Sequence, residues 1–384
     1  MNMNIAFLIR FWPYSGGVES VTRVLAKKFA SNDHKIFVLY IDKTGEYICA
    51  NNVIEIHLSN TYSVLPPNRV IGKIHAKTVI EEIHNILRTN NIDIVINQWF
   101  PANIVYMAAE HIKIIKCHHT AIKYTPVIKT LKQKVFYGIF RKSGGWLRIY
   151  KIYKNDYKLC DKWVFLSESI KRDAEWLYRI KNNNKLCVIP NPIEFDDKEN
   201  IDFLHRKKQV IYVGRLIPTK RVDYLLDVWK MINKNKRFYE WEFLIIGKGE
   251  HEEYLVNKVL SEKIENVIFE GYKEPDIYYK ESPIMLCASN SEGFLLTLIE
   301  AQRYGCVPIT TDSYPSAREI LIDDENGYIV EDDRIAAMVE KVTQLMIDKN
   351  KWEKMSHKAV ENASRYAINN VADMWYKLFD EVGR

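Results

Sequence analysis

The sequence has little of what would tie it to an oxidising compartment, a membrane span or a metal centre. Its six cysteines are scattered and form no C-x-x-C pair, so we expect reduced core thiols in a cytoplasmic protein. No run approaches the roughly 18 apolar residues of a membrane-spanning helix. The N-terminus lacks the basic and long apolar regions of a secretory signal. Because there is no D-x-D motif and no cluster of metal-ligating residues, we expect no metal and no cofactor.

What is present is the composition of an ordinary globular protein. Of its 384 residues, 47% are hydrophobic and 27% are charged, which is enough for two domains with large cores. The formal net charge of +6 is mild, so the position of the charges matters more than their sum.

Basic and aromatic residues concentrate in residues 123–158. This segment carries ten Lys or Arg residues and eight aromatic residues against a single acid, Asp156. Such a mixture favours an anionic membrane surface or a lipid-phosphate acceptor. A solvated basic helix pair with its aromatic rings in the core is one alternative, and a nucleic-acid surface is another. We expect the membrane surface and no nucleic acid, which places the protein on the inner face of the plasma membrane.

Short apolar runs alternate with amphipathic stretches along the chain. Buried strands are predicted at residues 5–9, 35–40, 53–57, 92–97, 112–117, 162–166, 210–213, 241–246 and 283–287. Between them, apolar spacing predicts helices such as residues 18–30 and 221–233. This alternation predicts an α/β fold of parallel sheets covered on both faces, with ligands at the carboxyl ends of the strands.

A break in this pattern marks a domain boundary. The turn Pro190-Asn191-Pro192 cannot continue as a helix, and the charged stretch 194–208 follows it. The alternation restarts at residue 210. We therefore predict a first domain of residues 1–190 and a second of residues 191–368.

Turns that suit a phosphate follow four of the predicted strands. They are Gly16-Gly17, Arg215 with Lys220, Gly247-Lys248-Gly249, and the helix start after Gly293. Arginine offers a planar fork and lysine a point charge, while a helix start offers free N–H groups, here at Leu295, Leu296 and Thr297. Each turn alone is more often a tight turn or a solvated charge, so their repetition carries the prediction.

Two carboxylates, Glu292 and Glu300, flank that helix start. Eight helical positions span about 12 Å and place both residues on roughly the same side. A ligand with hydroxyls at both ends and phosphates between them would fit this spacing. Taken alone, a surface Glu and an ordinary helix Glu explain the pattern equally well.

Two adjacent histidines, His118 and His119, follow the strand predicted at residues 112–117. A lone histidine is more often structural than functional. A pair at the carboxyl end of a parallel strand favours a functional role for one of them.

Taken as a set, these motifs resemble the retaining glycosyltransferases of the GT-B type, family 4. The segments that match are Ser15-Gly-Gly-Val-Glu19, Val188-Ile-Pro-Asn-Pro-Ile193, Val213-Gly-Arg-Leu-Ile-Pro-Thr-Lys220, Ile245-Ile-Gly-Lys-Gly249, Asn266-Val-Ile-Phe-Glu-Gly271, Ser291-Glu-Gly-Phe-Leu-Leu-Thr-Leu-Ile-Glu-Ala301, Gly305-Cys-Val-Pro308 and Glu325-Asn-Gly327. The resemblance covers essentially the whole chain and is weakest over residues 30–110. One departure is Leu295, where the family often has Gly, and it would reshape the sugar pocket.

The resemblance implies two Rossmann-like domains facing across a cleft, with residues 369–384 crossing back to the first domain. Arg215 and Lys220 would neutralise the diphosphate of a nucleotide-sugar, most commonly a UDP-sugar. Glu300 would bind the ribose and Glu292 the transferred sugar, while His119, or else His118, would face the reacting carbon. The remaining donor contacts would be Gly16, Gly17, Gly247, Gly271, Tyr272, Gly293, Phe294, Leu295, Leu296 and Thr297.

The activity that the resemblance implies is a retaining, metal-independent hexosyl transfer from this donor. The acceptor would be a lipid-linked or membrane-proximal glycan in the synthesis of a bacterial surface polysaccharide such as lipopolysaccharide or capsule. A nucleotide-sugar epimerase or a glycosyl phosphorylase would share the architecture. A basic membrane- or nucleic-acid-binding protein is the non-enzymatic alternative. The turn with Arg215 and Lys220, together with the two glutamates, favours the transferase.

Overall fold

The computed structural model describes residues 2–14, 16–59, 73–122, 153–178, 180, 184–194, 201–203 and 205–383. The chain divides into two compact units. The first unit is Met1–Glu194 with Ile368–Arg384, and the second unit is Phe195–Ala367. The sequence predicts that the first domain ends at residue 190 and that the chain returns to it at residue 369. The structure places these two points at Glu194 and Ile368.

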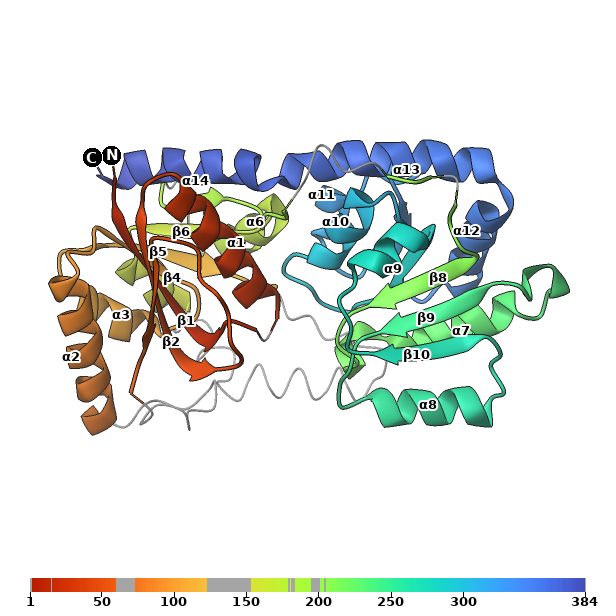
Figure 1. The fold of residues 1–384 in the computed structure, drawn as a ribbon, viewed down its shortest axis with the longest axis horizontal. Coiled ribbons are helices and arrows are strands. Elements are labelled where there is room, and N and C mark those ends of the chain that lie inside the picture. Colours follow the sequence, from red (N-terminus) through yellow and green to blue (C-terminus); the bar gives the residue numbers. More distant parts are fainter. Residues whose placement is uncertain are drawn as a thin grey trace. The chain divides into compact units, whose positions relative to one another are not determined.

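Each unit is built on one parallel sheet (Figure 1). The first sheet has the order β3-β2-β1-β4-β5-β6-β7 and the second has the order β10-β9-β8-β11-β12-β13. The strands of the first sheet are β1 Asn4–Trp12, β2 Lys35–Lys43, β3 Val53–His57, β4 Ile94–Asn97, β5 Lys113–His118, β6 Lys162–Phe165 and β7 Leu186–Val188. Those of the second are β8 Gln209–Val213, β9 Glu242–Ile246, β10 Val267–Gly271, β11 Ile284–Cys287, β12 Val307–Thr311 and β13 Tyr328–Val330. The predicted α/β fold of two Rossmann-like units is confirmed.

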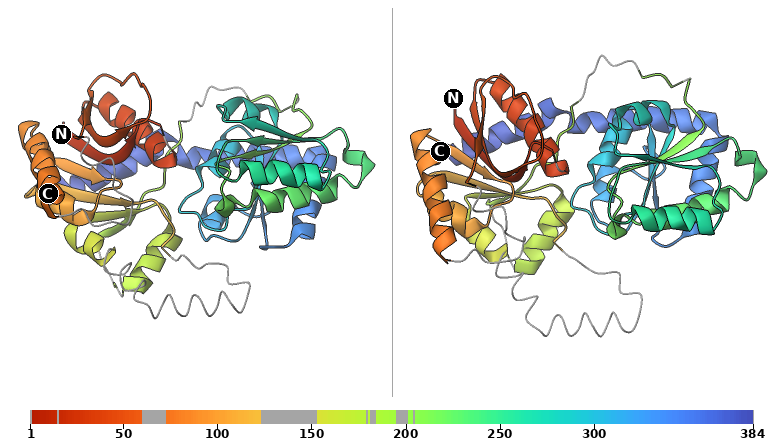
Figure 2. Two further views of the ribbon diagram at one scale, coloured as in Figure 1. Left: turned by 90° about the horizontal axis from the view of Figure 1, so that it is seen from below. Right: turned by 60° about the horizontal axis from the view of Figure 1, so that its bottom comes forward.

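Helices cover both faces of each sheet, as the views in Figure 2 also show. The first unit contains α1 Gly17–Ser31, α2 Lys73–Thr89, α3 Ala102–Ala109, α6 Glu168–Tyr178 and α14 Ile368–Gly383. The second contains α7 Val222–Ile232, α8 Glu252–Ser261, α9 Asp276–Glu281, α10 Leu296–Arg303, α11 Ala317–Ile320, α12 Ile335–Ile347 and α13 Lys349–Ala363. The described part of the second unit also contains short 3₁₀ turns, at η2 Pro218–Lys220, η3 Lys236–Phe238 and η4 Ser364–Tyr366.

The central strands contain continuous apolar runs because successive side chains enter two different cores. In β8, Val210 and Tyr212 belong to the core beneath α7, α8 and α12. Ile211, between them, packs on the opposite face with residues of α9 and α10. A strand buried on both faces therefore shows a continuous apolar run, which is the pattern that the sequence shows at these positions.

Helix α14 completes the first unit, although it follows the second unit in the chain. The ring of Phe29 in α1 packs against Trp375 and Phe379 of α14, with ring centroids 6.1 and 5.3 Å apart. These three side chains are buried. The C-terminal helix is thus part of the core of the first unit.

Apolar periodicity does not predict four of the described helices, α3, α8, α9 and α11, and the last of these has only four residues. Helix α3 is short and apolar on most sides, so it resembles a buried strand in sequence. In α8, only Leu255 is buried, and in α9 only Tyr279, so neither presents an apolar face.

Both sheets reverse their strand order next to their first strand. In the first unit the reversal lies between β1 and β4, and in the second it lies between β8 and β11. Loops that leave the carboxyl ends of such a strand pair diverge and leave room for a ligand. The fold therefore directs attention to residues 214–221 and 288–295 in the second unit.

Candidate active site

The loops that follow β8 and β9 are held together by their backbones. Gly214 donates to the Ile246 carbonyl and Leu216 donates to the Lys248 carbonyl, each at 3.0 Å. A Cβ atom on Gly247 would lie 1.9 Å from the Gly214 oxygen, and Gly247 has a φ of +142°. The approach of two backbones therefore requires glycine here. The structure thus gives Gly247 a packing role at the edge where a phosphate was expected.

Gly249 has the same function one step further along the loop. A Cβ atom on it would lie 2.2 Å from the carbonyl oxygen of Leu216. Strand β10 is joined to these loops in the same way, because the N–H group of Gly247 donates to the Gly271 carbonyl at 2.7 Å. Gly271 ends β10 with a φ of +70°, and the next side chain, Tyr272, is 72% exposed. An exposed aromatic ring at this edge suits stacking on a planar base.

Lys220 and Glu292 meet at the point where the strand order of the second sheet reverses. Lys220 ends the η2 turn after β8, and Glu292 lies in the loop after β11. Lys220 Nζ is 2.6 Å from Glu292 Oε1, and the two side chains are 16% and 15% exposed. The sequence predicts both residues as ligand contacts, but their separation of 72 residues conceals that they contact each other.

The two loops that carry this pair are also joined through their backbones. The N–H group of Asn290 donates to the carbonyl of Thr219 at 2.8 Å. Ser289, the preceding residue, is fully buried. This backbone hydrogen bond holds the two loops side by side. The side chains of Lys220 and Glu292 therefore reach each other without any movement of the backbone.

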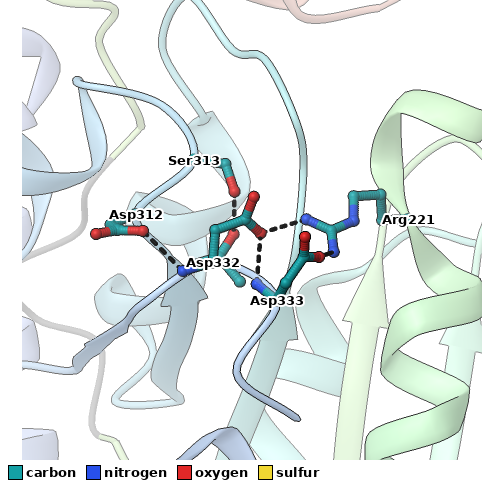
Figure 3. Close-up of polar contacts among 6 residues, drawn as sticks. Arg221, Asp312, Ser313, Asp332 and Asp333 are labelled. Carbon is teal, nitrogen blue, oxygen red and sulfur yellow. Dashed lines mark hydrogen bonds and ion pairs between the residues drawn. The ribbon is translucent and has the colours of Figure 1, made fainter. Parts of the chain in front are cut away.

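Arg221 anchors the same turn from the other side (Figure 3). It has left-handed backbone angles, with φ +53° and ψ +43°, and is largely buried. Its guanidinium forms ion pairs with Asp332 and Asp333, which follow β13. The N–H group of Asp332 in turn donates to Asp312, after β12, at 2.9 Å. This network connects the turn that carries Lys220 to two neighbouring strand ends.

Arg215 lies at the start of the loop and is exposed. Its carbonyl accepts a hydrogen bond from the Tyr212 hydroxyl at 3.0 Å. No ion pair joins its guanidinium to the residues that the structure describes. Its charge is therefore available to an anion, and the phosphate contact of Arg215 stays a prediction.

Helix α10 begins at Leu296, and Leu295 is its N-cap residue. The N–H groups at the start of such a helix have no partner within it. Glu292 lies before this helix, in an irregular turn. The predicted separation of about 12 Å assumed eight helical positions. That assumption is wrong, because the first part of the spacing is not helical.

The residues between the two carboxylates are mostly buried. Gly293, Phe294 and Leu295 are buried, and the Phe294 ring contacts Tyr366 edge to face at 5.6 Å. Leu296 and Thr297 are half-buried. The side chain of Leu295 therefore lies in the core of the second unit, and this segment can offer mainly backbone N–H groups to a ligand.

Glu300 faces α9 from α10. The Tyr279 hydroxyl donates to Glu300 Oε2 at 3.2 Å, and Tyr279 is fully buried. Burial raises the pKa of Glu300 to about 7, against the effect of the Tyr279 hydrogen bond, while the nearby charge of Asp276 raises it further. The carboxyl group is thus divided between its two protonation states near neutral pH. A protonated carboxyl can donate one hydrogen bond and accept fewer.

The two adjacent histidines of the first unit lie in different surroundings. His118, at the end of β5, is buried among aromatic rings, with centroids 5.2 Å from Tyr153, 5.9 Å from Trp163 and 5.6 Å from Phe165. It is therefore a core residue. His119 is half-buried, and its Nε2 atom contacts Gln98 Oε1 at 2.5 Å. Its Nδ1 atom is buried and has no hydrogen-bond partner among the described residues.

Gln98 is a residue that motif reasoning misses. It follows β4 at the strand reversal of the first sheet, is 4% exposed, and donates its N–H group to the Leu8 carbonyl at 3.0 Å. A buried amide directly after a central strand was the available signal. Burial, with the charge of Lys116, lowers the pKa of His119 to about 3, so the ring is neutral at pH 7. Gln98 then orients a neutral hydrogen-bonding group.

Gly16 and Gly17 open helix α1 of the first unit. Gly16 is the N-cap residue with extended backbone, and its carbonyl accepts from the Ser20 N–H group at 3.1 Å. A Cβ atom there would lie 3.5 Å from its nearest neighbour, a Glu19 oxygen. The local fold therefore tolerates a side chain at Gly16.

The predictions about membrane contact, metal binding and cysteines concern residues outside the candidate active site. The proposed membrane-facing segment 123–158 lies outside the described residues except for 153–158, which are helical. Among the described helices, none combines the length and the apolar composition needed to cross a bilayer. Within the same residues, no group of three or more His, Cys, Asp or Glu side chains could hold a metal ion. All six cysteines are free.

Comparison with known proteins agrees with the division into two units. Residues 15–197 match the family described as Glycosyltransferase Family 4. Residues 194–365 match the family described as Glycosyl transferases group 1. A glycosyltransferase of Haemophilus influenzae that is itself uncharacterised is 25% identical over 375 residues, which is 97% of this chain and 98% of that protein.

A relative with a named activity matches over a shorter length. The GalNAc-alpha-(1->4)-GalNAc-alpha-(1->3)-diNAcBac-PP-undecaprenol alpha-1,4-N-acetyl-D-galactosaminyltransferase of Campylobacter jejuni is 25% identical over 227 residues, or 59% of this chain and 62% of that protein. Among solved structures, the pneumococcal O-GlcNAc transferase GtfA in complex with UDP and GlcNAc aligns with a TM-score of 0.74 over 99% of both chains. At 15% identity, this likeness shows the fold.

Proposed function

Since this chain belongs to the family 4 glycosyltransferases of the GT-B type, we propose that it transfers a hexosyl group from a UDP-sugar to a lipid-linked or membrane-proximal glycan. The anomeric configuration of the sugar is retained. The product is part of a bacterial surface polysaccharide. Two relatives support parts of this proposal, because the one from Campylobacter jejuni is named for an undecaprenol-linked glycan and GtfA was solved with UDP.

The observation that carries the proposal is the set of charges around the Lys220–Glu292 contact. Lys220 and exposed Arg215 carry two positive charges on the loop after β8, and Lys220 contacts the loop that leads into α10. Such a group suits a diphosphate, while carboxylates on either side suit hydroxyls. We assign the transferred sugar to Glu292 and the ribose to Glu300. Tyr272 is assigned to the base because its ring is exposed next to Gly271.

The proposed reaction is a front-face displacement. The hydroxyl oxygen of the acceptor forms a bond to the anomeric carbon as the bond from that carbon to the β-phosphate oxygen breaks. The proton of the hydroxyl passes to the departing phosphate, so UDP leaves with no protein nucleophile. Negative charge develops on the diphosphate, and Arg215, Lys220 and the N–H groups of α10 stabilise it. We propose that these groups serve in place of a metal ion.

In the first unit, we assign the catalytic histidine to His119 in preference to His118. His118 packs in the aromatic core, whereas His119 is half-buried and is held by Gln98. Because Nε2 contacts Gln98, we assign the Nδ1 atom, which has no partner among the described residues, to the reacting sugar, and the neutral ring adds no charge. Gly16 and Gly17 remain assigned to the donor as a helix start. For the segment 123–158, we retain the anionic membrane surface as partner and the inner face of the plasma membrane as location.

A binding and turnover panel tests this proposal. UDP-glucose, UDP-galactose, UDP-N-acetylglucosamine and GDP-mannose are titrated by calorimetry and then incubated with undecaprenyl diphosphate-linked sugars. We expect one UDP-sugar to bind and to be transferred, with EDTA causing no loss, and with the product anomer matching the donor by NMR. Inversion of the anomer would contradict retention. Formation of a sugar phosphate and UDP when inorganic phosphate replaces the glycan acceptor would favour the phosphorylase alternative. Formation of an epimer from the UDP-sugar alone would favour the epimerase.

The membrane assignment has a separate test. Charge reversal at Lys134, Arg141 and Lys142 should release the protein from anionic vesicles while leaving UDP-sugar affinity unchanged. Equal flotation of the variant and the wild type would remove the membrane surface as a partner. Nucleic-acid binding that survives Lys220→Ala and Glu300→Ala would instead favour the non-enzymatic alternative.

A further inference from the structure

Lys220 and Glu292 neutralise each other at the place where the proposed function gives them different ligands. Their contact at 2.6 Å joins two side chains that are 16% and 15% exposed. By contrast, Lys230 and Glu262 of the same unit pair at 3.0 Å with 42% and 33% exposure. A pair withdrawn from water is coupled more strongly than an exposed pair and is less weakened by salt.

A diphosphate that enters this site must compete with Glu292 for Lys220. If it succeeds, the Glu292 carboxylate loses its partner and lies close to two phosphate charges. This repulsion is costly in a poorly solvated position. Hydroxyl groups from a sugar relieve the cost, because they donate hydrogen bonds to the displaced carboxylate. A nucleoside diphosphate without its sugar brings no such donor.

We propose that the Lys220–Glu292 pair distinguishes the sugar-bearing donor from the spent nucleoside diphosphate. When the donor binds, Lys220 leaves Glu292 and pairs with the diphosphate, and sugar hydroxyls donate hydrogen bonds to Glu292 in place of the lysine. After transfer the hydroxyls leave with the acceptor, and Glu292 returns to Lys220 and displaces the diphosphate. This inference rests on the proposed function and adds a specificity role, in product release, to residues of the same site.

The surrounding backbone favours an exchange of side chains alone. Asn290 and Thr219 are joined by a backbone hydrogen bond of 2.8 Å, which holds the two loops together. Arg221, next to Lys220, is fixed by Asp332 and Asp333. The change of partner then requires rotation about side-chain bonds of Lys220 and Glu292, which is fast compared with enzyme turnover.

The experiment compares the affinities of wild type and Glu292→Gln for UDP and for the tightest-binding of UDP-glucose, UDP-galactose and UDP-N-acetylglucosamine. We expect Glu292→Gln to bind UDP about tenfold more tightly, the order of effect that removal of one partly screened like charge produces. Its affinity for the UDP-sugar should be unchanged or lower. UDP should also become a stronger product inhibitor. Damage to the fold lowers affinity, so a gain for UDP alone cannot come from a structural defect.

Glu262→Gln is the matched control, because it neutralises a glutamate of the same unit that pairs with Lys230 at 3.0 Å and with Lys258 at 2.7 Å. It should leave both affinities as in the wild type. Unchanged or weaker UDP binding by Glu292→Gln would overturn the inference while leaving the proposed transferase intact. An equal gain for UDP in Glu262→Gln would also overturn it, since the effect would then be one of net charge. If the wild type binds neither UDP nor any of the three UDP-sugars, the proposed function itself fails.

Discussion

The hydroxyl of Tyr279 in α9 donates a hydrogen bond to Glu300 Oε2 in α10 at 3.2 Å. This contact lies in the core on one face of the second sheet, where Tyr279 is fully buried. The carboxylate that we assign to the ribose therefore has a partner within the protein. Its protonation depends on a balance between burial, which raises its pKa, and this hydrogen bond, which lowers it.

We predict that donor binding strengthens as the pH rises from 6 to 8. The pKa of Glu300 is raised to about 7, and the ionised form accepts hydrogen bonds from ribose hydroxyls. About a tenth of such a group is ionised at pH 6 and about nine-tenths at pH 8, so affinity should rise by up to about tenfold. Calorimetry with the UDP-sugar that binds in the panel measures this, because its phosphodiester groups do not titrate in that range. Glu300→Gln should bind more weakly with a flat profile, and a flat profile in the wild type would contradict the assignment.

Tyr279→Phe should move that pH profile toward higher pH. Loss of the hydroxyl removes the hydrogen bond that favours the ionised form of Glu300, and a hydrogen bond of about 1 kcal/mol corresponds to a shift of roughly half to one pH unit. Tyr278→Phe is the matched control, because the Tyr278 hydroxyl donates to Glu270 at 3.0 Å and leaves Glu300 untouched. Coincident profiles for the two variants would show that Tyr279 does not act through Glu300.

Alanine at Gly247 should destabilise the second unit severely. The new Cβ atom would lie 1.9 Å from the Gly214 oxygen, so the loops after β8 and β9 must separate. We expect a loss of about 3 kcal/mol or more, or failure to fold, measured by chemical unfolding. Gly16→Ala is the control, since its Cβ atom has 3.5 Å of clearance and the backbone is extended. Comparable stability of the two variants would contradict the packing role of Gly247.

Arg221→Ala should weaken nucleotide binding as well as stability. The buried guanidinium joins the turn of Lys220 to Asp332 and Asp333, and its removal leaves both carboxylates without that partner. We expect a loss of about 2 kcal/mol or more in unfolding free energy and a several-fold weaker affinity for UDP. Arg334→Ala should change neither quantity, since Arg334 and Glu331 are 64% and 70% exposed at 3.2 Å. Normal UDP affinity in a folded Arg221→Ala protein would exclude a positioning role.

The sequence allows the elements of the sheets to be predicted well, because strands buried on both faces appear as continuous apolar runs. The strand predicted at residues 35–40 lies within β2, whose residues 36–41 are all buried, and the helix predicted at residues 18–30 is α1 with one residue more at each end. Helices without an apolar face, such as α8, leave no periodic signal and are missed. The sequence also shows the glycines at strand ends. It cannot tell whether such a glycine allows a phosphate to approach or allows two backbones to pack, because both require the same residue type.

Sequence alone determined the two parallel sheets and the set of polar residues at their carboxyl edges, because both follow from local patterning and from the order of strands and turns. Which side chains contact one another was decided by the tertiary structure. Lys220 and Glu292 are 72 residues apart, and each of the pairs Tyr279–Glu300 and Gln98–His119 is separated by 21 residues. Spacing over such lengths carries no distance information, since the strands between them set the approach. The charge on Glu300 and the neutrality of His119 depend on burial in the same way.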